Sequence, residues 1–214
     1  MDIIAATKRF VKESLAQADA SHDWFHIERV LRLAEKIADK TSCDKTVVRL
    51  AALLHDIADA KFHNGDEEIG PATAVAFLKE QNVSADLIDQ VEFIIRHISF
   101  RNRMSIPKEL PIEFQIVQDA DRLDALGAIG IARTFHFGGM KNNLIFHPDI
   151  LPAHKQSRAQ YTKSNGTSIN HFHEKLLLLK DLMNTDAAKK VAAERHRFME
   201  EFLERFHAEW HGAV

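Results

Sequence analysis

The sequence predicts an all-α protein, and two observations lead to that prediction. The 214-residue chain contains only 8 glycines and 5 prolines, so few positions force a break in a helix. Several long segments place apolar residues at intervals of three and four, whereas no segment sustains the apolar and polar alternation of a half-buried strand. The segment "SNGTS" at 164–168 predicts a turn, but a helical pattern follows it.

The helical pattern recurs in eight segments along the chain. We expect helices at roughly 2–18, 24–40, 45–60, 67–80, 85–100, 112–136, 169–183 and 187–210. The second segment is the most clearly amphipathic, with these apolar residues on one face: Phe25, Ile27, Val30, Leu31, Ala34, Ile37 and Ala38. Asp23, Asp44 and Asp186 stand where N-caps are expected for the second, third and last of these helices.

A long loop is expected at 138–167, because this segment is rich in residues that interrupt helices. They are Gly138, Gly139, Asn142, Asn143, Pro148, Pro152, Ser164, Asn165 and Gly166. Long loops in compact proteins are often functional. We expect one domain over residues 1–214, with a core at about 20–137 and C-terminal helices at 168–211 packing on that core.

Composition excludes several classes of protein and site. The net charge of −3 and the pI near 6.5 provide no basic field for a nucleic acid. The single cysteine, Cys43, excludes an internal disulfide and a cysteine-based zinc site. No window approaches the roughly 18 apolar residues that span a membrane, and charges interrupt the N-terminal apolar residues, so no signal peptide is expected. These features predict a cytoplasmic protein that binds neither membrane nor nucleic acid.

Four side chains that can bind a divalent cation lie within or beside apolar helical patterns: His26, His55, Asp56 and Asp121. Two imidazoles and two carboxylates form a mixed nitrogen and oxygen shell, which suits Mn²⁺, Fe²⁺, Co²⁺, Ni²⁺ or Mg²⁺. Such a shell leaves about two octahedral positions for water and a substrate oxygen. Adjacent residues of a helix diverge by about 100°, but one ion can contact both His55 and Asp56 if it lies beyond the helix end.

Each of these residues also has an ordinary explanation when it is taken alone. A buried histidine is more often a hydrogen-bonded core residue than a ligand. Asp56 could cap a helix, and Asp121 could form an ion pair with Arg122 or Arg133. The residue types and their spacing leave these alternatives open.

The order His, His-Asp, Asp resembles the signature of the HD-domain superfamily of metal-dependent phosphohydrolases. The resemblance extends over about residues 15–210 and is greatest to the bacterial YedJ/YpgQ-like subgroup. It is carried by "SHDWFHIERVLRLA", "LAALLHDIADAKF", "IIRHISF", "DADRLDALGAIGIARTF" and "TSINHFHEKLLLLKDLMNT". It implies an all-α helical bundle with a metal site in a central cleft, and His26, His55, Asp56 and Asp121 as the ligands of one divalent ion. Mn²⁺ is favoured, and Zn²⁺ is also compatible with these ligands.

The resemblance also implies the reaction, which is the hydrolysis of a phosphate ester or anhydride. Asp59 would orient or deprotonate the attacking water; the nucleotidase branch of the superfamily more often has glutamate at this offset. The transition state gathers negative charge on phosphoryl oxygens, so we expect cationic groups around it. The candidates are Lys61 as a catalytic group, His97, Arg101 and Arg122 as substrate-binding groups, and Arg96.

The histidines differ in what their positions predict. His97 lies in the apolar segment "VEFIIRHISF", where an unpaired buried histidine would cost about 1–3 kcal/mol. His171 and Lys175 are four residues apart and could help to close the cleft. His196, His207 and His211 belong to an amphipathic C-terminal segment and are expected on the surface.

Several substrates and functions remain open at this stage. The resemblance suggests nucleoside or deoxynucleoside triphosphates, cleaved to monophosphate and pyrophosphate. A 5′-nucleotidase acting on monophosphates is the nearest alternative, and Trp24, Phe25 or Phe100 could stack on a base. A non-catalytic nucleotide sensor and an HD-fold di-iron oxygenase are alternatives from other classes. The amphipathic C-terminal helix could support a homodimer.

Overall fold

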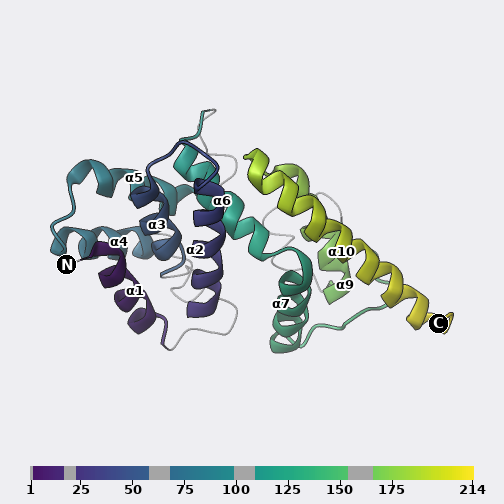
Figure 1. Ribbon diagram of the computed structural model, residues 1–214. Helices are drawn as coiled ribbons and strands as arrows, with labels where there is room; N and C mark the ends of the chain where they lie inside the picture. The colour runs from purple at the N-terminus through teal and green to yellow at the C-terminus, as the bar shows by residue number, and fades with distance from the viewer. Residues whose placement is uncertain (1, 17–22, 58–67, 99–108, 154–165) are drawn as a thin grey trace. The chain divides into compact units, whose positions relative to one another are not determined.

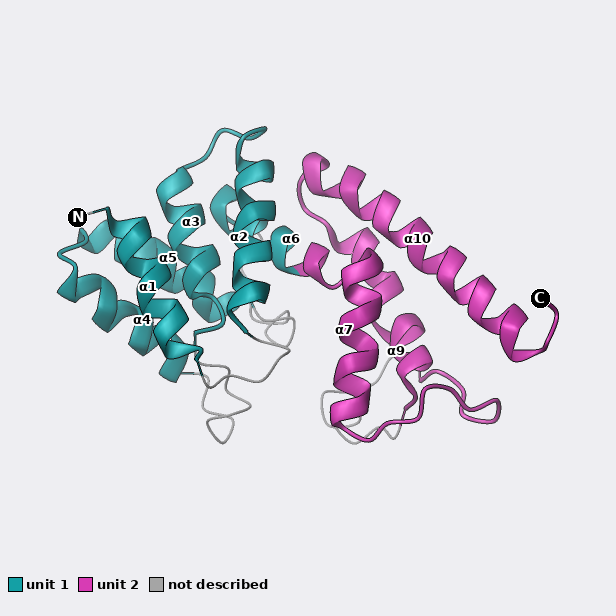
Figure 2. Cartoon of the chain, turned by 60° about the horizontal axis from the view of Figure 1, so that its bottom comes forward, with its two compact units in different colours: residues 1–121 teal, residues 122–214 magenta. Residues whose placement is uncertain are grey.

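The computed structural model describes residues 2–16, 23–57, 68–98, 109–153 and 166–214 (Figure 1). Throughout these ranges the regular structure is helical, and no strand occurs in them, which confirms the predicted all-α fold. The chain divides into two compact units, residues 1–121 and 122–214 (Figure 2). The single domain expected over 1–214, with its C-terminal helices packed on the core, stays a prediction.

The first unit is built around an almost entirely apolar helix, α3 (Lys45–Leu54). From Val47 to Leu54 this helix is buried apart from Arg49, as expected for a helix with apolar residues on all sides. Three helices pack against it: α1 (Ile3–Ser14), α2 (Trp24–Ala38) and α5 (Ala85–His97). The helix α4 (Ile69–Glu80) packs on α5.

Two of the three predicted N-caps are confirmed. The Asp23 carboxylate accepts a hydrogen bond from the backbone N–H of His26, and Asp44 accepts from Thr46 and Val47. The third prediction is wrong, because Thr185 and not Asp186 caps α10 (Asp186–Trp210), with its hydroxyl 3.2 Å from the Ala188 nitrogen. Asp186 instead occupies the first helical turn, where its charge complements the helix dipole.

The expected helix at 112–136 is two helices, α6 (Ile112–Asp124) and α7 (Gly127–Met140). The chain turns because Leu126 is extended and Gly127 has a φ of +72°, a conformation that favours glycine. The expected helix at 169–183 is likewise divided, into α9 (Ser168–Glu174) and the 3₁₀ helix η3 (Leu176–Leu182). The predicted loop at 138–167 begins later than expected, since α7 continues to Met140.

In the second unit, α7 packs against α9 and α10, and η3 packs against the same two helices. The buried face of α10 is formed by Ala188, Ala192, His196, Met199 and Leu203, which recur at intervals of three and four residues. The expectation that His196 lies on the surface is therefore wrong, because its position in this repeat turns it toward the packed side. His211 is exposed, as expected, and His207 is half-buried.

None of the helices in the described part of the chain is both long enough and apolar enough to cross a membrane. The longest, α10, has 25 residues but carries many charged side chains.

Candidate metal centre

Two helix ends bring the adjacent residues His55 and Asp56 toward His26. His26 lies in the first turn of α2, where its backbone N–H donates to the Asp23 carboxylate at 2.9 Å. His55 is the C-cap of α3, and Asp56 follows in a turn. Because the chain leaves the helix at His55, the side chains of these two neighbours can converge as they could not within a continuous helix.

The structure brings together all four side chains that the sequence pattern selected. His26 Nε2 lies 3.3 Å from His55 Nε2, 3.8 Å from Asp56 Oδ2 and 3.7 Å from Asp121 Oδ1. Asp121 Oδ1 lies 3.8 Å from His55 Nε2. Ligand atoms of His26, His55 and Asp56 all fall within 4.8 Å of one another. Asp121 therefore faces both imidazoles and not Arg133, whose guanidinium pairs with Asp124 at 2.9 Å.

The tautomer of His55 follows from the contact of its ring with a backbone carbonyl group. His55 Nδ1 lies 2.9 Å from the Ala52 carbonyl oxygen, which can only accept a hydrogen bond. Nδ1 therefore carries the proton in the neutral ring, and the Nε2 lone pair points toward His26. A backbone carbonyl on the second ring nitrogen is a common way of orienting a metal-binding histidine.

The distances from His26 Nε2 to the other three groups, and from His55 Nε2 to Asp121, are compatible with one shared cation. Two atoms bound about 2.1 Å from one ion lie about 3 Å apart at adjacent corners and about 4.2 Å apart at opposite corners. The separations of 3.3 to 3.8 Å fall between these limits. The ligand atoms of His26, His55 and Asp56 form one group within 4.8 Å, and Asp121, which lies near both imidazoles, is not part of that group. The two nitrogen and two oxygen donors suit Mn²⁺, Fe²⁺, Co²⁺, Ni²⁺, Mg²⁺ or Zn²⁺, and they do not select one of these.

The other predicted site residues within the described ranges make contacts of their own. His97, the last residue of α5, directs Nδ1 at the Phe93 carbonyl oxygen 2.8 Å away. The Arg122 guanidinium donates to the Leu182 carbonyl oxygen. Arg96 bonds to Glu68 and Glu92, so its charge is balanced locally. Asp59, Lys61 and Arg101 lie outside the described residues.

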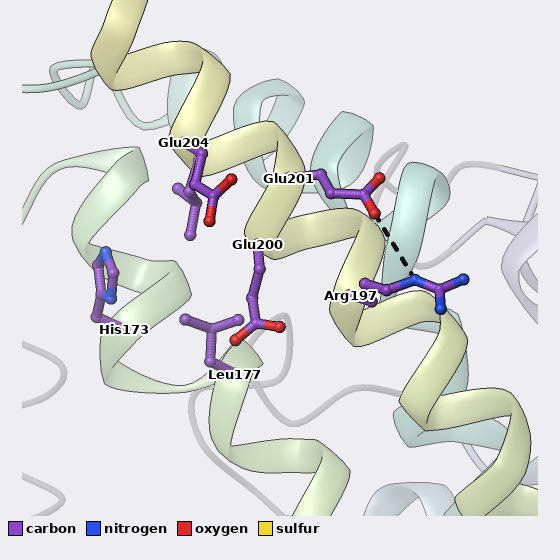
Figure 3. A pocket seen from close by; sticks show the side chains of 7 residues that line it. His173, Leu177, Arg197, Glu200, Glu201 and Glu204 are labelled. Carbon is purple, nitrogen blue, oxygen red and sulfur yellow. Dashed lines mark ion pairs between the residues drawn. The ribbon is translucent and has the colours of Figure 1, made fainter.

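A separate hollow lies in the second unit, on one side of α10 (Figure 3). Its volume is about 410 Å³, and it is lined by His173, Leu177, Arg197, Glu200, Glu201, Leu203 and Glu204. Arg197 is paired there with Glu201 at 3.7 Å. None of the four clustered side chains of the first unit lines this hollow, so its size does not make it the candidate centre.

His171 in α9 contributes a pH dependence to folding. Burial, aided by the charge of Lys175, lowers the pKa of His171 to about 4. In the unfolded chain His171 binds a proton near pH 6.5, whereas in the folded chain it binds one only near pH 4. The free energy of unfolding therefore falls as the pH decreases from 6.5 toward 4. When the pH is lowered from 7 to 5, His171 should lower the free energy of unfolding by about 2 kcal/mol.

We expect His171→Gln to remove this contribution, because glutamine does not titrate. Urea unfolding at pH 7 and pH 5 should show a smaller loss of stability in this variant than in the wild type. The exposed His136 in α7 provides the control: His136→Gln should retain the wild-type difference. An unchanged pH dependence in His171→Gln would contradict the burial of a neutral imidazole.

Comparison with known proteins agrees with the helical fold. Residues 24–126 match the family described as the HD domain. The chain is 39% identical over 197 residues to YpgQ of Bacillus subtilis (strain 168), an alignment that covers 92% of this chain and 88% of that protein. A solved structure from Lactobacillus plantarum has a TM-score of 0.85 and 40% identity, covering 98% of this chain and 97% of that one.

Two further similarities concern structures whose descriptions name a class or a ligand. A Bacillus thuringiensis structure described as an HD-superfamily hydrolase has a TM-score of 0.77 and 43% identity, covering 98% of this chain and 97% of that one. The structure of Bacillus subtilis YpgQ in complex with ADP has a TM-score of 0.75, covering 96% of this chain and 97% of that one; the structural alignment gives 33% identity.

The helical fold and the sequence similarity together define the class of protein. The chain belongs to the HD-domain superfamily of metal-dependent phosphohydrolases. Within that superfamily its similarity to YpgQ extends over nearly the whole chain, which confirms the predicted resemblance to the YpgQ-like subgroup.

Proposed function

We propose that this enzyme hydrolyses nucleoside or deoxynucleoside triphosphates to the monophosphate and pyrophosphate, with His26, His55, Asp56 and Asp121 binding one divalent ion. The convergence of the four ligand atoms is the observation on which the proposal rests. The ADP complex of YpgQ supports a nucleotide ligand, since ADP contains the α–β phosphoanhydride that this reaction would cleave. Mn²⁺ is the ion we favour for this mixed nitrogen and oxygen donor set.

When bound, the divalent ion would polarise a phosphoryl oxygen and lower the pKa of a coordinated water. The two buried histidines would bind it through Nε2, and the two carboxylates would balance its charge. Water would add to the α-phosphorus as the bond between that phosphorus and the bridging oxygen breaks, so that pyrophosphate leaves. The proton released by the water would pass to the Asp59 carboxylate, which we propose as the general base.

We propose that Lys61, His97, Arg101 and Arg122 contact the phosphates of the substrate. In His97 the bond from Nδ1 to the Phe93 carbonyl leaves Nε2 to meet a ligand. Arg122 donates to the Leu182 carbonyl oxygen, and for its contact with phosphate the proposal rests on the charge of its guanidinium and on the sequence. For Lys61 and Arg101 the proposal rests on the sequence alone.

Asp59→Ala should separate the roles of base and ligand. We expect the variant to retain its bound metal and to lose about 10²- to 10⁴-fold in turnover, the usual contribution of a general base. Metal content of the purified variant, measured by elemental mass spectrometry, should equal that of the wild type. If Asp59→Ala loses its metal, the carboxylate is a ligand and another group accepts the proton.

Product identification tests the proposed function directly. Metal-stripped protein with Mn²⁺ restored would be incubated with ribo- and deoxyribonucleotides carrying one, two or three phosphates, and the products read by mass spectrometry. Monophosphate and pyrophosphate appearing together from a triphosphate, only when metal is present, are the expected result. Conversion of monophosphates to nucleosides would instead identify a 5′-nucleotidase. Binding of nucleotides without any turnover would contradict catalysis and favour a sensor.

A further inference from the structure

Three arginines hold the C-terminal end of α6, the helix that carries Asp121. Arg195 of α10 donates from Nη1 to the Leu123 carbonyl oxygen, and Arg122 donates to the carbonyl of Leu182 in η3. Arg133 of α7 pairs with the buried Asp124 at 2.9 Å. The last carbonyls of an α-helix lack partners within the helix, and cations there complement its dipole. These contacts therefore stabilise the final turn, in which Asp121 is the fourth residue from the end.

The position of the Asp121 side chain depends on the backbone of this turn, whereas packing around the side chains fixes the positions of His26 and His55. The side chains of His26 and His55 are 2% and 3% exposed, so packing on every side limits their movement. The Asp121 side chain is 39% exposed. Its position is accordingly set mainly by the backbone that carries it, and the ends of helices fray when nothing holds them.

Arg195 packs closely against the chain at Gly127. A β-carbon added at Gly127 would lie 3.0 Å from Arg195 Cγ and 3.2 Å from Arg195 Cβ, so the arginine stem lies directly on the glycine backbone. Burial lowers the pKa of Arg195, and the charge of Asp124 opposes that shift. Burial of a charged guanidinium is unfavourable, and here the guanidinium donates to a carbonyl at the end of a helix. This contact therefore indicates a specific role for Arg195.

We propose that Arg195 is a positioning residue for the metal centre: by binding the Leu123 carbonyl it holds the last turn of α6 so that Asp121 stays within reach of His26 and His55. The proposal rests on the proposed function, in which Asp121 is a metal ligand. Arg195 itself touches neither the metal nor the substrate in this role. It acts through the backbone of α6, two residues beyond Asp121.

The affinity of the folded protein for Mn²⁺ tests this role. Metal-stripped Arg195→Met would be titrated with Mn²⁺ at a temperature where circular dichroism shows wild-type helicity. We expect the dissociation constant to rise about tenfold, the lower end of the effect seen for residues that orient metal ligands. The matched control is Arg197→Met on the same helix, whose exposed guanidinium pairs with Glu201 at 3.7 Å. This control should bind Mn²⁺ as the wild type does.

A double variant distinguishes positioning from a general effect on stability. If Arg195 acts through Asp121, Arg195→Met should weaken Mn²⁺ binding in the wild-type background and add nothing in an Asp121→Asn background. Additive effects in the two backgrounds would overturn the proposal. If Arg195→Met does not fold, Arg195→Gln replaces it, since glutamine tolerates the polar surroundings but is too short to reach the carbonyl.

The outcomes also separate this inference from the proposed function. Wild-type Mn²⁺ affinity in a folded Arg195 variant, together with weakened binding in Asp121→Asn, would overturn the positioning role and leave the ligand assignment intact. Wild-type affinity in Asp121→Asn would overturn the ligand assignment, and the positioning role with it.

Discussion

Asp121→Ala is expected to abolish turnover, with a loss of at least about 10³-fold in kcat/KM, and to weaken metal binding by about 10²-fold or more. The substitution removes the carboxylate oxygen that lies 3.7 and 3.8 Å from the two imidazole nitrogens. Because that side chain is 39% exposed, the fold should tolerate the change. The loss should therefore appear in a protein of normal stability.

Hydrolysis with Mn²⁺ restored after metal stripping, read beside the metal content of each protein, measures both effects. Asp56→Ala should behave in the same way. Asp89→Ala is a matched control, since Asp89 is an exposed aspartate of α5 in the same unit, and its removal should change neither quantity. Wild-type activity in either Asp56→Ala or Asp121→Ala would show that the ligand assignment is wrong.

Gly130→Ala is expected to cause the largest loss of stability, about 3 kcal/mol in the free energy of unfolding. A β-carbon at this position of α7 would lie 2.2 Å from the Ala125 carbonyl oxygen and 2.5 Å from its carbonyl carbon. Both are backbone atoms, so the clash can be relieved only by opening the corner between α6 and α7.

The same helix offers a control for this prediction. At Gly139 an added β-carbon would meet nothing within 4 Å, so Gly139→Ala should leave stability unchanged or raise it by up to about 1 kcal/mol through helix propensity. Urea unfolding of the two variants should therefore shift the midpoint in opposite directions or shift only the first. Equal stability in the two variants would contradict the close packing of this corner.

The location of the helices could be predicted from sequence because apolar periodicity reports which face of a helix is buried. The apolar run of α3 is buried, and so is the predicted apolar face of α2 except for Phe25, which is 62% exposed near the start of the helix. The boundaries were less predictable where two residues could serve the same purpose. Thr185 and Asp186 can both cap a helix, and only the packing of Thr185 in the second unit determines which one does.

The break between α6 and α7 was not predicted, although Gly127 and Gly130 are both visible in the sequence. A glycine within a helical pattern does not by itself show whether it adopts a positive φ or makes room for a carbonyl group. Gly127 does the first and Gly130 does the second. Gly127 lies against Arg195, which is distant in the sequence, and Gly130 lies against Ala125, which precedes the turn.

The sequence by itself determined the helical class, the superfamily and the four candidate ligands, because these depend on residue types, their periodicity and their order. The convergence of the four side chains was decided by the tertiary structure, since His26 lies in α2, His55 caps the end of α3 and Asp121 lies in α6. The tertiary structure also decided the contact between Arg195 and the Leu123 carbonyl, which we propose positions Asp121. Arg195 lies 72 residues beyond Leu123, so no local pattern could relate the two, and only the folding of α10 within the second unit brings the guanidinium to that carbonyl.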